Sequence, residues 1–208
     1  MLANWSTSSY VCTWVGVTCG ERHNRVQHLN LLNMKLGGTI SPSLGNMSFL
    51  VSIELRNNSF GGELPKEICR LHKLKYLDFA YNKFVGEIPA MLGNLSQLQY
   101  LALGFNKFNI GFIPQSIGKL RRLKILALSD NGLSGPILQT ISNLSLLEGI
   151  YLQNTHLSGF IPQSISEFRQ LKILVLSDNE LSGPILQTIS NQSLLEGIYL
   201  DNNHLSGT

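Results

Sequence analysis

The stretch LKYLDFAYNKFVGEIPAMLGNLSQ, from Leu74 to Gln97, decides the fold. Leu77 and Phe79 alternate with Tyr76, Asp78 and Ala80, which is the period of a strand with one buried face. Gly86 and Pro89 then favour a turn, and widely spaced apolar residues follow. So short a strand cannot bury its apolar face alone, so the stretch must stack on neighbours of the same kind.

The same pattern recurs along the chain every 24 or 25 residues. Each unit reads roughly L-x-x-L-x-L-x-x-N-x-L-x-G-x-I-P-x-x-L-x-x-L-x-x. The units open at Val26, Leu50, Leu74, Leu98, Leu123, Leu147, Leu171 and Leu195. The passages beginning at Ser129 and Ser177 span more than one unit and differ only at Gly132/Glu180, Leu144/Gln192, Gln153/Asp201 and Thr155/Asn203. The near-identity indicates tandem duplication of a pair of units.

These repeats predict an α/β repeat solenoid, with a parallel β-sheet on its concave face and short helical, 3-10 or irregular segments on its convex face. We assign residues 1–25 to an N-terminal capping segment. Residues 26–208 form leucine-rich repeats, with seven complete units and one truncated unit. The last unit stops before its convex segment, which leaves Leu186, Ile189 and Leu194 without a neighbour. We therefore expect a truncated chain that frays or self-associates at this end.

Two columns of the repeat serve the backbone. Asn58, Asn82, Asn106, Asn131, Asn179 and Asn203 fall where each strand turns away, and their amides should bond backbone groups of their own and the next turn. The glycines at 62, 86, 111, 135, 159, 183 and 207 suit angles that other residues avoid.

Four departures from the repeat should have local consequences. Met34 and Thr155 replace the column asparagine, so hydrogen bonds must be replaced there. Residues 108–114 carry one extra residue, which predicts a bulge before Gly111. Gln192 replaces an inward apolar residue and should reach water.

The composition limits the class of protein. Of 208 residues, 43% are hydrophobic and 14% are charged, which argues against a disordered chain. The net charge is +3 with scattered Lys and Arg, so we expect no nucleic-acid partner. No apolar run is long enough for a membrane helix, so this segment should make no membrane contact. The first residues lack the basic start and apolar core of a signal peptide.

The chain resembles the plant leucine-rich-repeat receptor kinases in their extracellular part. The segments FGGELP (60–65), FVGEIP (84–89) and LSGFIP (157–162) carry the resemblance. The N-terminal segment LANWSTSSYVCTWVGVTCGERHNRVQHLNL is similar to the family's capping motif, at Trp5, Cys12, Trp14, Gly16, Val17 and Cys19. Together these cover essentially the whole chain, and the cap and first repeats look most like the large class that includes immune receptors.

The resemblance implies a disulfide between Cys12 and Cys19, against the alternative of two free thiols. Cys69 would then be an unpaired thiol at the surface or half-buried. A disulfide implies an oxidising compartment, which fits an extracellular or cell-surface location with the full-length protein at the plasma membrane. Candidate N-glycosylation sites follow the Asn-x-Ser pattern at Asn4, Asn46, Asn57, Asn94, Asn143 and Asn191.

Nothing in the sequence predicts catalysis or a cofactor. Glu54 and Asp78 share an outward column on adjacent strands and could approach like a glycosidase pair, but Arg56 lies beside them on an open face. The five histidines show no metal spacing. We therefore expect no enzyme activity and no metal or cofactor in this chain, although a kinase domain can follow in the full-length protein.

The candidate ligand-binding residues point outward from the strands of units two to four. They are Glu54, Arg56, Tyr76, Asp78, Tyr81, Tyr100 and Phe105. Rigid aromatic residues are common interface anchors, and the charges could fix the register of a ligand. The alternative is that the aromatic rings only pair across strands and stabilise the sheet. Units five to eight present mostly small or aliphatic side chains on this face, and their Tyr151 and Tyr199 are two strands apart.

The resemblance implies an extracellular module that recognises a peptide or protein in defence or developmental signalling, with a co-receptor as a second partner. The alternatives are a secreted protein like the inhibitors of microbial polygalacturonases, or a co-receptor fragment.

Overall fold

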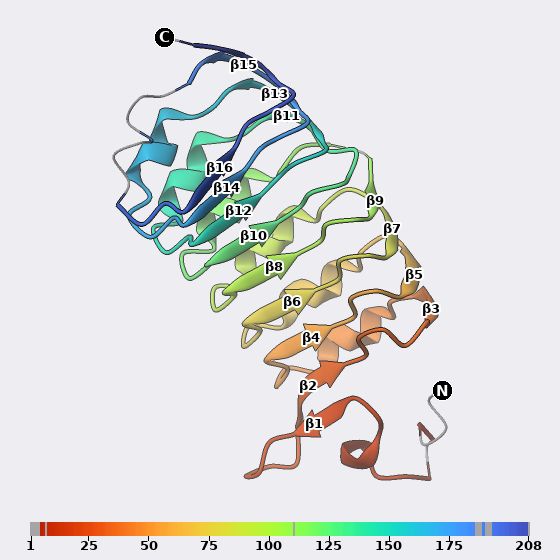
Figure 1. Ribbon diagram of the computed structural model, residues 1–208. Helices are drawn as coiled ribbons and strands as arrows, with labels where there is room; N and C mark the ends of the chain where they lie inside the picture. The colour runs from red at the N-terminus through yellow and green to blue at the C-terminus, as the bar shows by residue number, and fades with distance from the viewer. Residues whose placement is uncertain (1–4, 7, 110, 186–188, 190–192, 208) are drawn as a thin grey trace.

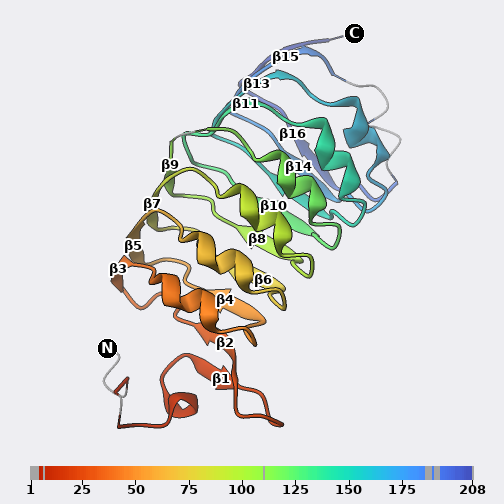
Figure 2. The ribbon, with the colours of Figure 1, turned by 180° about the vertical axis from the view of Figure 1, so that it is seen from behind.

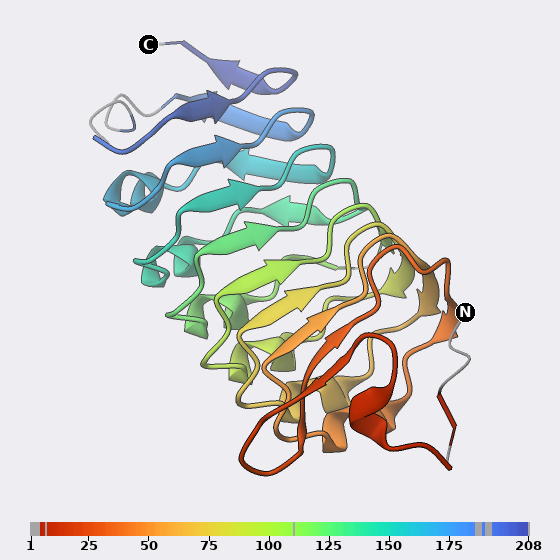
Figure 3. The same cartoon turned by 60° about the horizontal axis from the view of Figure 1, so that its bottom comes forward.

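The structure is a computed structural model that describes residues 5–6, 8–109, 111–185, 189 and 193–207. The chain forms a curved coil of stacked turns, with its two ends at opposite ends of the coil (Figures 1 and 3). Each turn contributes a short strand to the concave face, as the repeat predicts, and the sequence period of 24 or 25 residues is one turn of the coil.

A nine-stranded sheet lines the concave face (Figure 1). The capping strand β1 pairs antiparallel with β2, and the later neighbours are parallel with equivalent residues of each unit side by side. In spatial order the strands are β1 (Val17–Cys19), β2 (Val26–Asn30), β4 (Ser52–Glu54), β6 (Tyr76–Asp78), β8 (Tyr100–Ala102), β10 (Ile125–Ala127), β12 (Gly149–Tyr151), β14 (Ile173–Val175) and β16 (Gly197–Tyr199).

Short 3-10 segments cover the convex face, which confirms the expectation for that side (Figure 2). Most begin just after a proline, whose fixed φ suits the entry to a helical turn. Their bounds are η1 (Val11–Thr13, in the cap), η2 (Pro42–Asn46), η3 (Lys66–Arg70), η4 (Ala90–Asn94), η5 (Gln115–Lys119), η6 (Gln139–Asn143) and η7 (Gln163–Glu167).

A second set of strands, which the sequence analysis does not predict, runs along one edge of the coil (Figure 1). It forms two four-stranded sheets: β3 (Gly37–Thr39), β5 (Ser59–Gly62), β7 (Lys83–Gly86) and β9 (Lys107–Phe108), then β11 (Ser134–Pro136), β13 (His156–Phe160), β15 (Glu180–Pro184) and β17 (His204–Ser206). The break between β9 and β11 coincides with the extra residue of unit four. An isolated bridge pairs Phe112 with Ser134 across it, and the Gly132 N–H donates to the Phe108 oxygen. Ile110, inside the expected bulge, lies outside the described residues.

Inward columns of leucine and isoleucine fill the interior between the sheet and the convex segments. Leu50, Leu74 and Leu98 are completely buried and occupy one column on successive turns. Three phenylalanines add a stacked series within units three and four, with ring centroids 5.4 Å apart for Phe79 and Phe84 and 6.4 Å apart for Phe84 and Phe108. The core is therefore continuous along the coil, as stacking requires.

The column asparagines bond their own turn and the preceding turn, so the expectation that they reach the next turn is wrong. The Asn82 amide donates to the carbonyl oxygens of Leu55, Phe79 and Ala80, and its oxygen accepts from the backbone N–H of Phe60. Leu55 and Phe60 belong to the unit before. The direction follows from the coil, which brings the previous strand end directly beside the inward amide.

Thr155 keeps part of this ladder without an amide. Its hydroxyl donates to the carbonyl oxygen of Leu152 and contacts Oδ1 of Asn179 on the next turn. Met34, at the same place in unit one, packs against the core as a partly buried apolar side chain. Gln192, the fourth departure, lies outside the described residues.

Cys69 is free but fully inside the protein, so its expected position at or near the surface is wrong. It is 3% exposed, and burial raises the pKa of its thiol to about 11. The same column holds Gly45 and Gly93, where an added Cβ would lie 2.3 Å from a backbone oxygen of the next turn. The column is thus in contact with the neighbouring turn and away from solvent.

Candidate ligand-binding face

The sheet register brings most of the predicted binding residues together on β4, β6 and β8. Ser52, Tyr76 and Tyr100 lie side by side on these strands, and Glu54 pairs with Asp78 one strand over. Tyr81 and Phe105 follow β6 and β8 at equivalent turn positions. The residues come from three neighbouring units, so the repeat itself places them on one patch.

The aromatic residues of this patch form two stacked pairs. The rings of Tyr76 and Tyr100 have centroids 4.3 Å apart with planes inclined by 10°. The rings of Tyr81 and Phe105 are 4.0 Å apart and inclined by 9°. The Arg56 guanidinium lies 4.7 Å from the centroid of the Tyr81 ring, a cation–π contact. The second pair is the more accessible, with Tyr81 38% and Phe105 39% exposed.

The backbone at this second pair is unusual for aromatic residues. Tyr81 and Phe105 both have φ of +55°, in the left-handed region that disfavours bulky side chains. The equivalent position in the six other units is Asn33, Asn57, Asp130, Asn154, Asp178 and Asn202, all also at positive φ. Asn and Asp tolerate this conformation best among non-glycine residues. Aligning the units by this column would have revealed the two exceptions, but sequence reasoning missed that the position requires a positive φ.

The carboxylates of the patch are held by protein groups. Asp78 Oδ1 accepts from the backbone N–H of Ala80 at 3.0 Å, and Asp78 Oδ2 lies 3.7 Å from Nη1 of Arg56. Glu54 Oε2 accepts from Nδ2 of Asn30 at 3.0 Å. Asp78 is only 2% exposed, so the prediction that it offers an open surface charge is wrong. Its neighbours cover it.

Burial governs the titration of these groups. It raises the pKa of Asp78 above the ordinary value of 3.8, against the opposing effects of the Ala80 N–H and the Arg56 charge. It also raises the pKa of Glu54, and the nearby Asp78 adds to that rise. Both effects follow from taking a carboxylate partly out of water.

The C-terminal half of the face carries different groups. Tyr151 and Tyr199 are separated by Val175 on the strand between them, so they cannot stack directly. At the strand entrances, Glu148 lies between two lysines, with its oxygens 3.0 Å from Nζ of Lys124 and 3.1 Å from Nζ of Lys172. One carboxylate thus bridges two lysines, and Tyr151 and Tyr199 form no stacked pair in this half.

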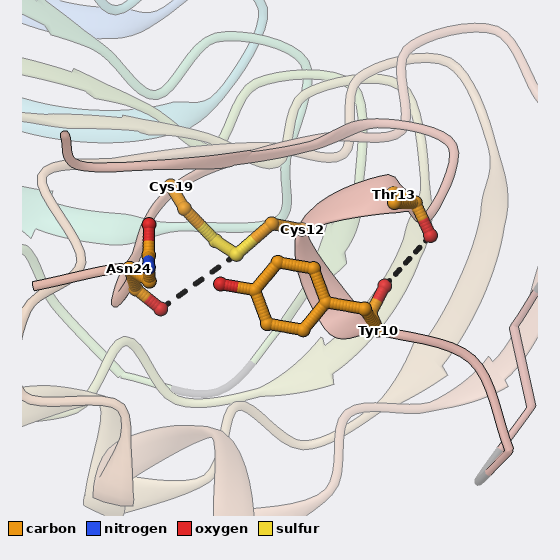
Figure 4. The surroundings of a disulfide bond; sticks show 5 residues. All are labelled: Tyr10, Cys12, Thr13, Cys19 and Asn24. Carbon is orange, nitrogen blue, oxygen red and sulfur yellow. Dashed lines mark hydrogen bonds between the residues drawn. A yellow bond between two sulfur atoms is a disulfide. The ribbon is translucent and has the colours of Figure 1, made fainter.

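A disulfide fixes the cap next to the first repeat (Figure 4). It joins Cys12 and Cys19, whose Cα atoms are 5.6 Å apart, as the resemblance implies. Cys12 Sγ also lies 3.6 Å from the carbonyl oxygen of Asn24, in the turn between β1 and β2. A disulfide sulfur has no hydrogen to donate, so this is a contact. The bond therefore anchors one end of the hairpin that begins the concave sheet.

The convex surface carries three of the candidate glycosylation residues. Asn46, Asn94 and Asn143 end the alternate 3-10 segments η2, η4 and η6 and are exposed, and Asn57 is exposed at a turn after β4. Asn4 and Asn191 lie outside the described residues. Accessibility is compatible with modification, which remains a prediction.

Within the described residues, no three His, Cys, Asp or Glu side chains gather in a way that could hold a metal ion. The same part of the chain contains no helix with the length and apolar character needed to cross a bilayer.

Two family models match the chain. The leucine rich repeat N-terminal domain matches residues 1–20, and the Leucine Rich Repeat matches residues 49–71, 73–95, 122–144 and 170–192. These matches and the coil define the class: a leucine-rich-repeat protein with a capped N-terminus. The chain belongs to this family and, within it, to the plant leucine-rich-repeat receptor-kinase ectodomains.

Curated relatives support the narrower assignment. A probable LRR receptor-like serine/threonine-protein kinase of Arabidopsis thaliana is 54% identical over 55 residues, and the LRR receptor-like serine/threonine-protein kinase EFR of the same plant is 56% identical over 55 residues. Each match covers 26% of this chain and 5% of the relative. The chain therefore corresponds to a small part of these receptors, and that part is leucine-rich repeat.

Solved structures extend the likeness to nearly the whole chain. PEPR1 in its complex with AtPEP1 has a TM-score of 0.92 at 30% identity, over 98% of this chain and 29% of that one. The Arabidopsis receptor kinase HAESA, in complex with the peptide hormone IDA and the co-receptor SERK1, has a TM-score of 0.81 at 31% identity, over 98% and 39%. A plant ice-binding protein has a TM-score of 0.91 at 30% identity, over 98% and 66%. The coil alone thus does not choose between functions.

Proposed function

We propose that this chain is the extracellular recognition region of a plant receptor-like kinase and that it binds a peptide or protein ligand on the concave face. The ligand contacts the patch of Tyr76, Tyr81, Tyr100 and Phe105. Glu54 and Arg56 fix its register, and the buried Asp78 positions the Arg56 guanidinium. A kinase domain elsewhere in the full-length protein carries the signal, in defence or development, and a co-receptor is the second partner.

The observation that carries this proposal is the backbone conformation of Tyr81 and Phe105. A residue held in an unfavourable region of φ/ψ space costs of order 1–3 kcal/mol, and such residues concentrate at functional sites. Six units use Asn or Asp at this position, so the fold has no need of an aromatic ring there. A bound ligand gives a reason for placing two exposed rings at equivalent turns of adjacent units.

The patch is also organised before any ligand arrives. The two ring pairs and the Arg56–Tyr81 contact restrict side chains that would otherwise lose rotamer freedom on binding. PEPR1 and HAESA, which have the same coil, are found in complexes with AtPEP1 and with IDA and SERK1. This precedent supports a peptide ligand and a co-receptor here, and it favours the receptor over the secreted inhibitor.

The competing account is that the rings stabilise the sheet by stacking. It explains the 4.0 Å contact equally well, since such pairs contribute to stability wherever strands lie side by side. Binding and stability measurements on the same variants are therefore needed to separate the two accounts.

The experiment selects peptides from a random displayed library on the wild-type protein and measures their Kd. Tyr81→Ala with Phe105→Ala should weaken the selected peptides by at least about tenfold, because exposed aromatic anchors dominate such interfaces. Tyr151→Ala with Tyr199→Ala removes two rings from the other half of the same face and should change Kd by less than about twofold.

The reverse order of the two effects would move the site to the C-terminal half of the face. No loss from either pair would move it off the concave face. Circular dichroism of each variant checks that the fold is retained.

A further inference from the structure

A pocket lies beside the N-terminal end of the concave face, where the cap meets the first repeats. It has a volume of about 570 Å³, and its walls come from the β1–β2 turn and from the chain segments just before β4 and β6. The charged residues that line it are Glu21, Arg22, Arg25 and Lys73, together with His23 and His28. Three permanent positive charges thus face one acidic group.

The floor of this hollow, which we call the cap pocket, is a column of three equivalent residues. Arg25, Phe49 and Lys73 are 24 residues apart and so occupy the same position on three successive turns. The Arg25 Cζ lies 5.4 Å and the Lys73 Nζ 4.1 Å from the centroid of the Phe49 ring. A single ring at the end of unit one therefore holds a cation from the end of the cap and a cation from the end of unit two.

This arrangement positions the charges without neutralising them. A cation–π contact restrains the side chain, but the ring carries no net charge. Within the described residues, Arg22, Arg25 and Lys73 take part in no salt bridge. The Phe49 ring orders two of these cations, Arg25 and Lys73, and both are left free for an anion.

The cap keeps this pocket in place. The turn that carries Arg22 and His23 closes through hydrogen bonds between the Gly20 N–H and the Arg25 oxygen and between the Asn24 N–H and the Gly20 oxygen, at 2.9 and 3.0 Å. The Cys12–Cys19 disulfide anchors the strand entering it. The wall of the pocket is therefore held in place by backbone hydrogen bonds and a disulfide.

We propose that the cap pocket binds an acidic segment of an extended peptide. Arg forms paired charge-assisted hydrogen bonds with a carboxylate, and Lys adds a second charge two units away. Two parallel strand spacings are about 9.6 Å, and acidic residues two apart in an extended peptide are about 6.8 Å apart, a difference that flexible side chains can bridge. The favoured ligand segment is therefore acid-x-acid.

The position of the pocket favours a peptide over an acidic polysaccharide. His28 lines the pocket and also begins the row His28, Ser52, Tyr76 and Tyr100 across the concave sheet. His28 Nδ1 lies 2.7 Å from Oγ of Ser52, so the row is continuous with the aromatic patch. One extended peptide can follow this row and place its acidic end in the pocket. In this respect the inference rests on the proposed function.

The test uses a fluorescein-labelled Glu-Gly-Glu-Gly-Glu peptide as probe, with Gln-Gly-Gln-Gly-Gln as the neutral control. Wild-type protein should bind the acidic probe and not the neutral one, and its Kd should weaken several-fold between about 50 and about 300 mM NaCl because salt screens exposed charges. Arg25→Gln with Lys73→Gln should weaken it by at least about tenfold, whereas Arg25→Lys with Lys73→Arg should stay within about threefold.

The matched control removes the same charge from another basic hollow. Lys119 and Arg121 line a convex pocket of about 800 Å³, and Lys119→Gln with Arg121→Gln should change the Kd by less than about twofold. If both charge-removing double variants weakened the Kd equally, binding of the probe would depend only on net charge, and the proposal would fail. It would also fail if wild type did not bind the probe, or if an oligomer of galacturonic acid bound more than about tenfold tighter than the peptide.

The outcome can be separated from that of the proposed function. Tyr81→Ala with Phe105→Ala should leave binding of the acidic probe unchanged, because neither ring lines the pocket. If library peptides bind at the aromatic patch while the acidic probe binds nowhere, the proposed function stands and the cap pocket inference is overturned.

Discussion

At the scale of single residues, the position of a side chain in the repeat explains more than its chemical type. Asp78 illustrates this because it points to the concave face, yet its neighbours leave it only 2% exposed. It therefore behaves as a buried carboxylate whose ionisation is opposed by lost hydration and favoured by Ala80 and Arg56.

This environment predicts how stability depends on pH. The folded-state pKa of Asp78 is raised, so the folded protein holds this proton more tightly than the unfolded chain does. Its stabilising contribution is complete below the ordinary value of 3.8 and is lost as pH rises through the raised pKa. Asp78→Asn should therefore make the melting temperature fall less steeply with pH in that window, as measured by thermal unfolding from about pH 3 upward.

Glu148 provides a control of opposite sign. Hydrogen bonds from Lys124 and Lys172 lower its pKa, so its contribution is present above the ordinary value of 4.5 and lost as pH falls. Glu148→Gln should not flatten the melting curve as Asp78→Asn does. A profile for Asp78→Asn that matches wild type would show that Asp78 does not titrate differently in the two states.

At the scale of elements, each strand depends on the asparagine that follows it. Asn82 satisfies four backbone groups, and two of them belong to the preceding turn. Asn82→Ala would leave the part-buried Phe60 N–H without its side-chain partner, whereas the Leu55 oxygen keeps the bond from Asn58. We expect the free energy of unfolding to fall by about 1–3 kcal/mol, measured by urea denaturation.

Thr155→Asn is the complementary change, because it puts the amide back where unit six lacks it. It should raise the free energy of unfolding by about 1 kcal/mol if the new amide makes the bonds that Asn82 makes. A destabilised Thr155→Asn would mean that the Thr155 hydroxyl and Asn179 have adapted to each other beyond the simple ladder.

The sequence predicted the elements that repeat and missed those that depend on contact between turns. Alternation in Leu74–Phe79 and the glycine column sufficed for the concave strands and their turns. The edge sheets were missed because strands such as Gly37–Thr39 are short, glycine-rich and without an apolar alternation. The burial of Cys69 was missed because it is set by the neighbouring turn.

At the scale of the whole molecule, two candidate sites lie along one face. The aromatic patch occupies units two to four, and the cap pocket adjoins it at the N-terminal end. The residues of the patch could be predicted from the sequence, because equivalent positions of successive repeats are neighbours in a solenoid. The sequence did not supply the stacking distances, the cover over Asp78 or the positive φ of Tyr81, because these depend on the curvature of the coil and on side-chain conformation.

The duplicated units lie outside both candidate sites. They repeat most of the inward columns, with Gln192 in place of Leu144 and Asn203 in place of Thr155. They also present Val175 between Tyr151 and Tyr199, so their face lacks a stacked aromatic pair. A repeat without a stacked aromatic pair on its outer face can be duplicated without creating a second binding site. The duplication lengthens the coil and leaves the aromatic patch unchanged.

The central claim is that Tyr81 and Phe105 are retained for a ligand and not for the stability of the fold. Its most direct test is the free energy of unfolding of Tyr81→Asn with Phe105→Asn, measured by urea denaturation beside wild type. Asn is the residue that other units place at this positive φ, so the variant keeps the turn and removes the rings. We predict unchanged stability or a gain of about 1–2 kcal/mol, because the backbone strain is relieved. A loss of more than about 1 kcal/mol would show that the stacked pair stabilises the sheet and would contradict the claim.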